Sequence, residues 1–524
     1  MLDLTKQVLQ NLIKLVQAYR NGESSESTMY YVDDIKKVFI KLNSMNLIND
    51  FYESIRNEFS SEADIYILLL SVIYNYVNDE ESLMEIMYLL CQDKIEFFTG
   101  LNVRTQIESC IFRNPNISRN YRLRRKIHKS QLLKLGEMLN LELPYRPYSK
   151  RNEKRIVIVT NQLLVDLHAP TNITKEICYI LQKKMGFEVL LIVAVEGTGS
   201  VDIKDIWFDP IKINYVTEYT GNFLIERNGE QIAGYQIIIS QNNLDELRRL
   251  VVDVYNYNPA YVWYMGGLTL FADLFRDCTT VLAMPFTDGY AISEAPIMVN
   301  YLNSQSNDVK DMESYLKETN QISVHYDYRI PVKSSDKQYA RTDFALKNND
   351  FVISIVGNRL DTEITDDFIL FLKKVLGIDP NVVIVFIGVY EHYNMLLEDK
   401  VFKDKTRYLG FQDDLLGILT MMDLFLNPPR QGGGTGAIYS LYNGVPVVTL
   451  DHCDVANFVS KEDVCANDIQ MLDRIEKYIT DPVYYEKKSK DAINIRLQLS
   501  ENNLTISTNE LLDEVKKIAV LRDT

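Results

Sequence analysis

A run of small residues near the end of the chain has the composition of a phosphate-binding turn. It comprises Gly432, Gly433, Gly434, Thr435 and Gly436. An apolar run at 423–427 precedes it, residues with helical apolar spacing follow it, and a second apolar run occupies 445–450. The predicted order of strand, glycine turn, helix and strand lets backbone N–H groups approach a phosphate at the positive end of a helix. The same residues would also form a tight strand-to-helix turn that binds nothing.

Two known phosphate-binding motifs are absent from this turn. No Gly-Lys-Ser or Gly-Lys-Thr follows the glycines, so it is not the P-loop of a nucleoside triphosphatase. Its glycines also lack G-x-G-x-x-G spacing, which argues against a dinucleotide-dependent enzyme.

Asn358 and Arg359 form a second candidate for phosphate binding. They follow the predicted strand 351–356 directly. Ligands of open α/β sheets bind outside the carboxyl ends of the strands, so Arg359 should point into the same crevice as the glycine turn. Its guanidinium offers a planar fork of donors that suits a diphosphate. The alternative is a surface turn that contains an arginine by chance.

Candidate bases lie in an earlier part of the chain, again after predicted strands. His168 lies between strand 155–160 and helix 172–185, and is able to act as a general base on an acceptor hydroxyl. Asp288 follows strand 280–284 and is the second candidate, although Asp-Gly pairs also form turns without chemistry. Gly266-Gly267 would allow close backbone approach on the same side. A lone histidine often has a structural role, yet His168 ranks slightly ahead of Asp288.

The elements that must position these residues form two successive blocks of alternating strands and helices, 149–335 and 336–524. Continuous apolar runs such as 155–160 are typical of parallel strands covered on both faces. The pattern predicts an α/β protein with two Rossmann-like domains and a cleft between the carboxyl ends of their sheets. The polar segment 326–348 fits a hinge. A last helix near 506–521 closes the second block and could pack across either domain.

Residues 1–148 are predicted to form an all-α domain that precedes these two domains in the chain. Apolar residues repeat at three and four positions, as helices require, in 4–16, 35–42, 65–77 and 83–98. The prolines of 143–148 mark its boundary. This domain could bind an acceptor, a protein partner or another copy of the chain. Alternatively, it only stabilises the fold as a helical cap.

Composition limits the possible partners. The formal net charge of −16 disfavours nucleic-acid binding, which needs a basic surface. Two basic segments, 121–129 and 146–155, could contact a membrane surface or an acidic acceptor, but a solvated helix face and a linker are the favoured interpretation. The six scattered cysteines contain no C-x-x-C pair and favour a cytoplasmic location. We found neither a signal peptide nor an apolar run long enough for a membrane helix.

The motif Val356-Gly-Asn-Arg-Leu360, together with 406–450, resembles the donor domain of GT-B fold glycosyltransferases. The resemblance implies twin Rossmann-like domains and a nucleotide-sugar, expected to be a UDP-sugar, in the C-terminal one. It implies that the diphosphate binds at Gly432–Gly436 with help from Arg359. It also implies that 408–411 and 413–416 lead to the nucleotide base.

The sequence departs from this family at three positions. Many retaining members carry two glutamates where Gln431 and Tyr439 stand here, and a lysine near the position of Ile364. No metal-binding motif is present, and Asp413-Asp414 is more simply explained as the acidic start of a helix. No cofactor is therefore expected, and the reaction should be metal-independent.

The predicted function is transfer of a hexose or N-acetylhexosamine from a nucleotide-sugar to a protein or glycan acceptor. The alternative is a non-catalytic GT-B-like binding subunit or chaperone of a glycosylation or secretion complex, which the missing glutamates favour. A nucleotide-sugar epimerase of the same architecture would need more carboxylates and histidines in the cleft than the sequence supplies.

Overall fold

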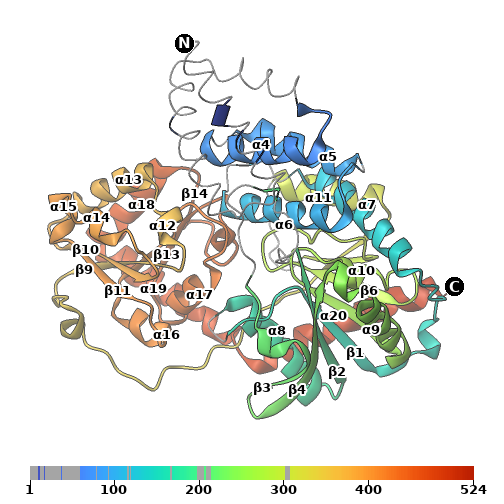
Figure 1. Cartoon of the computed structure of the whole chain (residues 1–524). Coiled ribbons are helices and arrows are strands. Elements are labelled where there is room, and N and C mark those ends of the chain that lie inside the picture. Colours follow the sequence, from blue (N-terminus) through green and yellow to red (C-terminus); the bar gives the residue numbers. More distant parts are fainter. Residues whose placement is uncertain are drawn as a thin grey trace.

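A computed structural model describes residues 59–523 apart from 78, 93, 115–116, 118–119, 166–167, 198–205, 208–213 and 301–306, together with a few isolated positions before residue 59. It contains two separate sheets with a helical region over them (Figure 1). The predicted α/β class with two Rossmann-like units is confirmed.

The first sheet has eight strands in the order β3-β4-β2-β1-β5-β6-β7-β8, and only β3 is antiparallel to its neighbour. The sequence has five apolar runs that predict strands here, at 155–160, 188–194, 235–240, 261–265 and 280–284, and all five are present as β1, β2, β4, β5 and β6. Three were missed, because β3 is an edge strand with alternating exposed residues and β7 and β8 have four residues each. The strands are β1 (Asn152–Thr160), β2 (Glu188–Glu196), β3 (Gly221–Arg227), β4 (Glu230–Ile239), β5 (Pro259–Met265), β6 (Thr280–Met284), β7 (Ile297–Asn300) and β8 (Ile322–His325).

Helices cover both faces of this sheet. On one face lie α9 (Leu244–Tyr257), α10 (Leu270–Asp273) and α11 (Asn307–Glu318). On the other lie α8 (Ala169–Tyr179) with its π-helical extension and the last helix, α20 (Glu501–Arg522). The α20 residues Leu504, Leu511 and Val515 join the core of this sheet. The final helix, whose packing the sequence left open, thus crosses back to the first domain.

The second sheet has six parallel strands in the order β11-β10-β9-β12-β13-β14. Segment 326–350 connects β8 to the first strand of this sheet, β9 (Phe351–Gly357). The other strands are β10 (Val382–Gly388), β11 (Thr406–Gly410), β12 (Leu424–Leu426), β13 (Val447–Leu450) and β14 (Val464–Cys465). The helices are α12 (Leu360–Glu363), α13 (Asp366–Leu376), α14 (Tyr393–Leu396), α15 (Lys400–Lys403), α16 (Leu415–Ile418), α17 (Gly434–Tyr442), α18 (Asp468–Thr480) and α19 (Pro482–Ile493).

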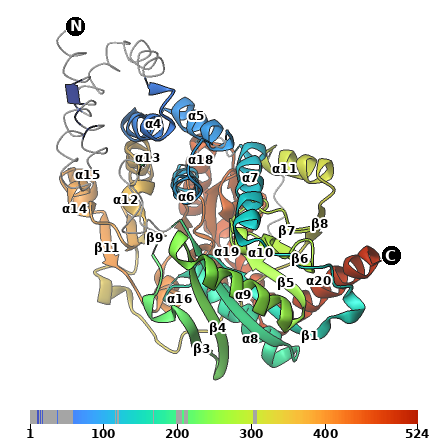
Figure 2. The same cartoon turned by 45° about the vertical axis from the view of Figure 1, so that its right-hand side comes forward.

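The helical region contains α4 (Ala63–Val77), α5 (Glu80–Cys91), α6 (Phe97–Arg113) and α7 (Tyr121–Leu139). The helices expected at 4–16 and 35–42 lie outside the described residues apart from a few positions. The prediction of one helix over 83–98 was wrong, because α5 ends at Cys91 and Glu96 caps the start of α6 by accepting a hydrogen bond from the Thr99 N–H. Figures 1 and 2 both place α6 between the two sheets.

A buried ion pair and a buried hydrogen bond fix the helical region to the first sheet. Arg104 of α6 pairs with Glu196 at the end of β2 at 2.8 Å, and both side chains are at most 4% exposed. His128 of α7 lies 2.6 Å from Asp273 of α10. Burying charges is costly unless partners compensate them, so this interface depends on a specific register of the helices on the sheet.

The first basic segment, 121–129, belongs to this interface. The fully buried Arg125 pairs with Glu294, and Arg122 contacts Asp311 and Glu318. Arg124 pairs with Glu108 of the neighbouring helix. The buried contacts of Arg124 and Arg125 contradict the solvated-face interpretation for these two side chains, whereas Arg122 is 36% exposed and agrees with it. Membrane contact through this segment stays a prediction.

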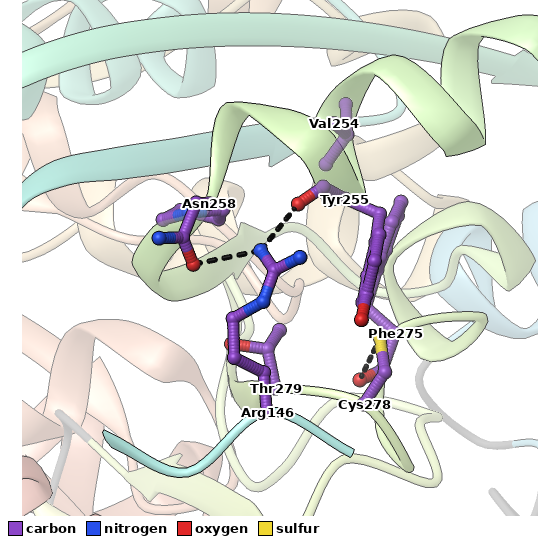
Figure 3. A pocket seen from close by; sticks show the side chains of 8 residues that line it. Arg146, Val254, Tyr255, Asn258, Phe275, Cys278 and Thr279 are labelled. Carbon is purple, nitrogen blue, oxygen red and sulfur yellow. Dashed lines mark hydrogen bonds between the residues drawn. The ribbon is translucent and has the colours of Figure 1, made fainter. Parts of the chain in front are cut away.

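The arginines of the second basic segment, 146–155, also have internal partners. Arg146 donates hydrogen bonds to the Tyr255 carbonyl and to Asn258 Oδ1 beside a small cavity at the start of β5 (Figure 3). Arg151 donates to Thr280, and Arg155 pairs with Glu188. These contacts secure the amino-terminal edge of the sheet, which is opposite to the predicted cleft. Membrane contact through this segment stays a prediction.

Within the part of the chain that the structure describes, no helix is long and apolar enough to cross a membrane.

Candidate functional site

The glycine turn lies at the carboxyl edge of the second sheet, between β12 and α17. Gly432 and Gly433 have φ angles of 87° and 84°, a left-handed conformation that favours glycine. Gly433 is the N-cap of α17, and no side chain caps this helix. Helix N-termini leave their first N–H groups without an intrahelical acceptor, and here these belong to Gly434, Thr435 and Gly436. This end of the helix can therefore bind an anion.

A carboxylate already occupies one part of the turn. Asp454, which is 4% exposed, accepts a hydrogen bond of 2.8 Å from the Gly432 N–H. The predicted phosphate site at 432–436 is thereby narrowed, because an anion at Gly432 would meet this carboxylate. The positions best placed for a phosphate are 434–436.

Arg359 lies against this turn, as the sequence predicted. Its Nη2 donates a 2.8 Å hydrogen bond to the Gln431 carbonyl, and its Nε donates to Glu363 Oε1. Among the residues that the structure describes, none accepts a hydrogen bond from its Nη1. The side chain is 34% exposed, so Nη1 can reach a ligand. Asn358, the neighbouring candidate, is exposed.

A second arginine, Arg430, packs against the buried side of the turn at Gly433. The sequence analysis missed it. Its side chain is 4% exposed and pairs with Glu363 at 2.6 Å. It also donates to Asn427 Oδ1 and to the Val356 carbonyl. A Cβ at Gly433 would lie 2.6 Å from its Nη2. It lies in the loop that follows strand β12, as Arg359 lies in the loop that follows β9, so the rule that identified Arg359 also applies to Arg430.

The candidate bases lie at the carboxyl edge of the first sheet. His168 is the N-cap residue of α8, and its Nδ1 lies 2.9 Å from the Thr171 hydroxyl. Burial lowers the pKa of His168, which keeps the imidazole neutral at physiological pH. Asp288 is half-buried in the turn after β6. Gly266, with a φ of 155°, packs close to Tyr264 and Asn161.

Contacts between the domains place α8 near α17. Phe458, which follows β13, packs against the core of the first sheet and also approaches Gly434. Arg227 of β3 forms an ion pair with Glu176 of α8, and its positive charge counteracts the rise that burial causes in the pKa of Tyr439. These contacts join the two domains near α8 and α17, and none of them involves His168 or Asp288. Their catalytic roles stay predictions.

The three departures from the family pattern have different surroundings. Gln431 and the half-buried Tyr439 lie at or beside the turn. Ile364 is 6% exposed and belongs to the apolar core of the second domain, so it cannot contact a ligand there. The residue one position earlier is Glu363, which binds both arginines.

No group of three or more His, Cys, Asp and Glu side chains that could hold a metal ion occurs among the described residues. Asp414 caps α16 by accepting a hydrogen bond from the Gly417 N–H, which agrees with the simpler explanation for Asp413-Asp414.

Comparison with solved structures defines the class of the fold. A mutant O-GlcNAc transferase of Thermobaculum terrenum superposes with a TM-score of 0.55 over 99% of each chain at 12% identity. The HepE protein of Anabaena in complex with UDP superposes with a TM-score of 0.45 at 12% identity, and the match covers 69% of this chain and 100% of HepE. A glycosyltransferase of Rickettsia africae superposes with a TM-score of 0.46 at 12% identity, and the match covers 70% of this chain and 99% of that glycosyltransferase. No protein-family model matches the sequence, and no curated protein matches it.

Two Rossmann-like units, together with the match along the whole chain, define a GT-B fold. The chain thus has the GT-B glycosyltransferase fold with an N-terminal helical region, as the resemblance implied.

The support that Arg430 gives to the turn can be tested with two glycine substitutions. Gly433→Ala and Gly410→Ala both place a side chain at positive φ, but only the former meets a guanidinium, since the space at Gly410 is open. We expect Gly433→Ala to lower the free energy of unfolding by about 1–3 kcal/mol more than Gly410→Ala does, because it displaces Arg430. Urea unfolding measures the difference, and equal unfolding midpoints would show that Arg430 does not constrain the turn.

Proposed function

We propose that the protein is a metal-independent glycosyltransferase that transfers a hexose or N-acetylhexosamine from a nucleotide-sugar, in our assignment a UDP-sugar, to a protein or glycan acceptor. The observation that carries the proposal is the position of Arg359 against an uncapped helix N-terminus. The diphosphate would accept hydrogen bonds from the N–H groups of 434–436 and from Arg359 Nη1. These fixed donors would stabilise the negative charge of the leaving group as the glycosidic bond breaks.

The nucleoside would extend from the diphosphate along the carboxyl edges of β10 and β11. Val389 and Phe411 are 37% and 42% exposed there, so a base can pack on apolar surface. Tyr408 donates its hydroxyl to the Gly388 carbonyl and accepts from the Tyr390 N–H, which fixes the wall behind them. This arrangement supports the base pocket that the resemblance implied at 408–411.

The acceptor would enter from the first domain. In this proposal His168 removes the proton from the acceptor hydroxyl, and Asp288 is the second candidate for that role. A neutral, partly buried imidazole beside the Thr171 hydroxyl is suited to accept a proton. The structure matched over the full length belongs to an O-GlcNAc transferase, which supports an N-acetylhexosamine as one choice of sugar.

The alternative remains a GT-B-like subunit that binds a partner without catalysis. The absence of glutamates at Gln431 and Tyr439 favours it. The preserved geometry of Arg359, Arg430 and the uncapped helix favours the enzyme, because a site without a ligand has no need for an exposed arginine directed at a helix N-terminus.

Donor binding is tested by calorimetric titration of UDP into the intact protein and two arginine variants. We expect micromolar binding by the wild type and about 10- to 100-fold weaker binding by Arg359→Ala, which loses charge-assisted hydrogen bonds. Arg407→Ala is the control, since Arg407 donates to backbone carbonyls, including that of Ala345, in the same domain. Failure of the wild type to bind UDP, GDP, TDP or their sugars would exclude the enzyme and leave the binding subunit.

The assignment of the base is tested by the pH dependence of transfer. A histidine base works only when neutral, so activity should fall as the pH drops through its pKa. Because burial lowers the pKa of His168, the acidic limb should lie below about 6.5, the ordinary histidine value. His168→Gln should abolish transfer but leave UDP binding intact. If His168→Gln is active and Asp288→Asn is not, Asp288 is the base.

A further inference from the structure

One side chain of the helical region reaches the proposed donor site. Phe112, the penultimate residue of α6, lies with its ring 4.6 Å from the Arg359 guanidinium carbon. This distance is that of a cation–π contact. The Phe112 side chain is 40% exposed and belongs to no apolar core among the described residues, so packing within the helical region does not account for its position.

The other end of α6 is fixed to the opposite domain. Arg104 forms the buried pair with Glu196, and a Cβ at Gly197 would collide with the Thr105 hydroxyl. Phe98 and Leu101 belong to the core of the first sheet. Phe112 is eight residues beyond Arg104, about 12 Å further along the helix. Thus α6 is anchored on the first domain and extends over the edge of the second (Figures 1 and 2).

The contact between the Phe112 ring and Arg359 restricts the motion of the arginine side chain. An exposed arginine loses rotamer entropy when a ligand orders it. Here Glu363, the Gln431 carbonyl and the Phe112 ring hold the guanidinium before any ligand binds. Only Phe112 comes from outside the donor domain.

We propose that Phe112 is a positioning residue of the donor site, which orders Arg359 for the diphosphate and makes donor affinity depend on the placement of α6. The inference rests on the proposed function. It gives the helical region a direct part in donor binding that is separate from any acceptor or partner it binds.

The experiment measures UDP affinity and donor kinetics for variants at position 112 of the full chain. Phe112→Leu keeps an apolar side chain but removes the ring face, and should weaken UDP binding about two- to fivefold. It should raise KM for the donor with little change in kcat. Phe112→Tyr should restore the wild-type values. Tyr88→Leu removes an exposed ring from α5 that does not touch Arg359. This control variant should change neither the UDP affinity nor the KM for the donor.

A double-mutant comparison separates this role from a structural one. In the Arg359→Ala background, Phe112→Leu should have no further effect on UDP affinity. If Phe112→Leu binds UDP as the wild type does, or weakens binding equally in both backgrounds, the inference is wrong while the proposed function stands. If the wild type binds no nucleotide, the proposed function fails and this inference with it.

Discussion

The proposed donor site depends on the carboxylate of Glu363, which holds two arginines on one glycine turn. It pairs with the buried Arg430 under Gly433 and with Arg359 beside Gln431. Removing it would leave the Arg430 charge buried without its carboxylate, which typically costs several kcal/mol. With Asp454 on Gly432, two carboxylates balance two arginines. Because these charges balance, a diphosphate would be held by oriented donors, the backbone N–H groups and Arg359 Nη1, and not by a net positive charge of the turn.

Local signals predicted much of the fold. Apolar runs marked the central strands because buried parallel strands need them, and alternation with helices predicted two α/β units. The edge strand β3 was missed because only alternate residues of it are buried, so it lacks the long apolar run of a central strand. The packing of α20 on the first sheet and the pairing of Arg125 with Glu294 join residues far apart in the chain. A charge in a sequence shows that a partner is needed but does not say which one.

The site was predicted in part for the same reason. Arg359 and the glycine turn both follow strands of one sheet, and the rule for carboxyl edges was enough to place them together. Arg430 met that rule but was not considered. Asp454 and Phe112 could not be found this way, because their roles arise from the return of the chain after β13 and from the docking of α6.

The most direct measurement of the central claim is a crystal structure of the protein with UDP. The account predicts that the diphosphate oxygens lie within hydrogen-bond distance of the N–H groups of Gly434–Gly436 and of Arg359 Nη1, with Asp454 still bound to Gly432. A diphosphate bound at any other helix N-terminus, or a turn that releases Arg359 and opens without contacting the phosphates, would contradict it.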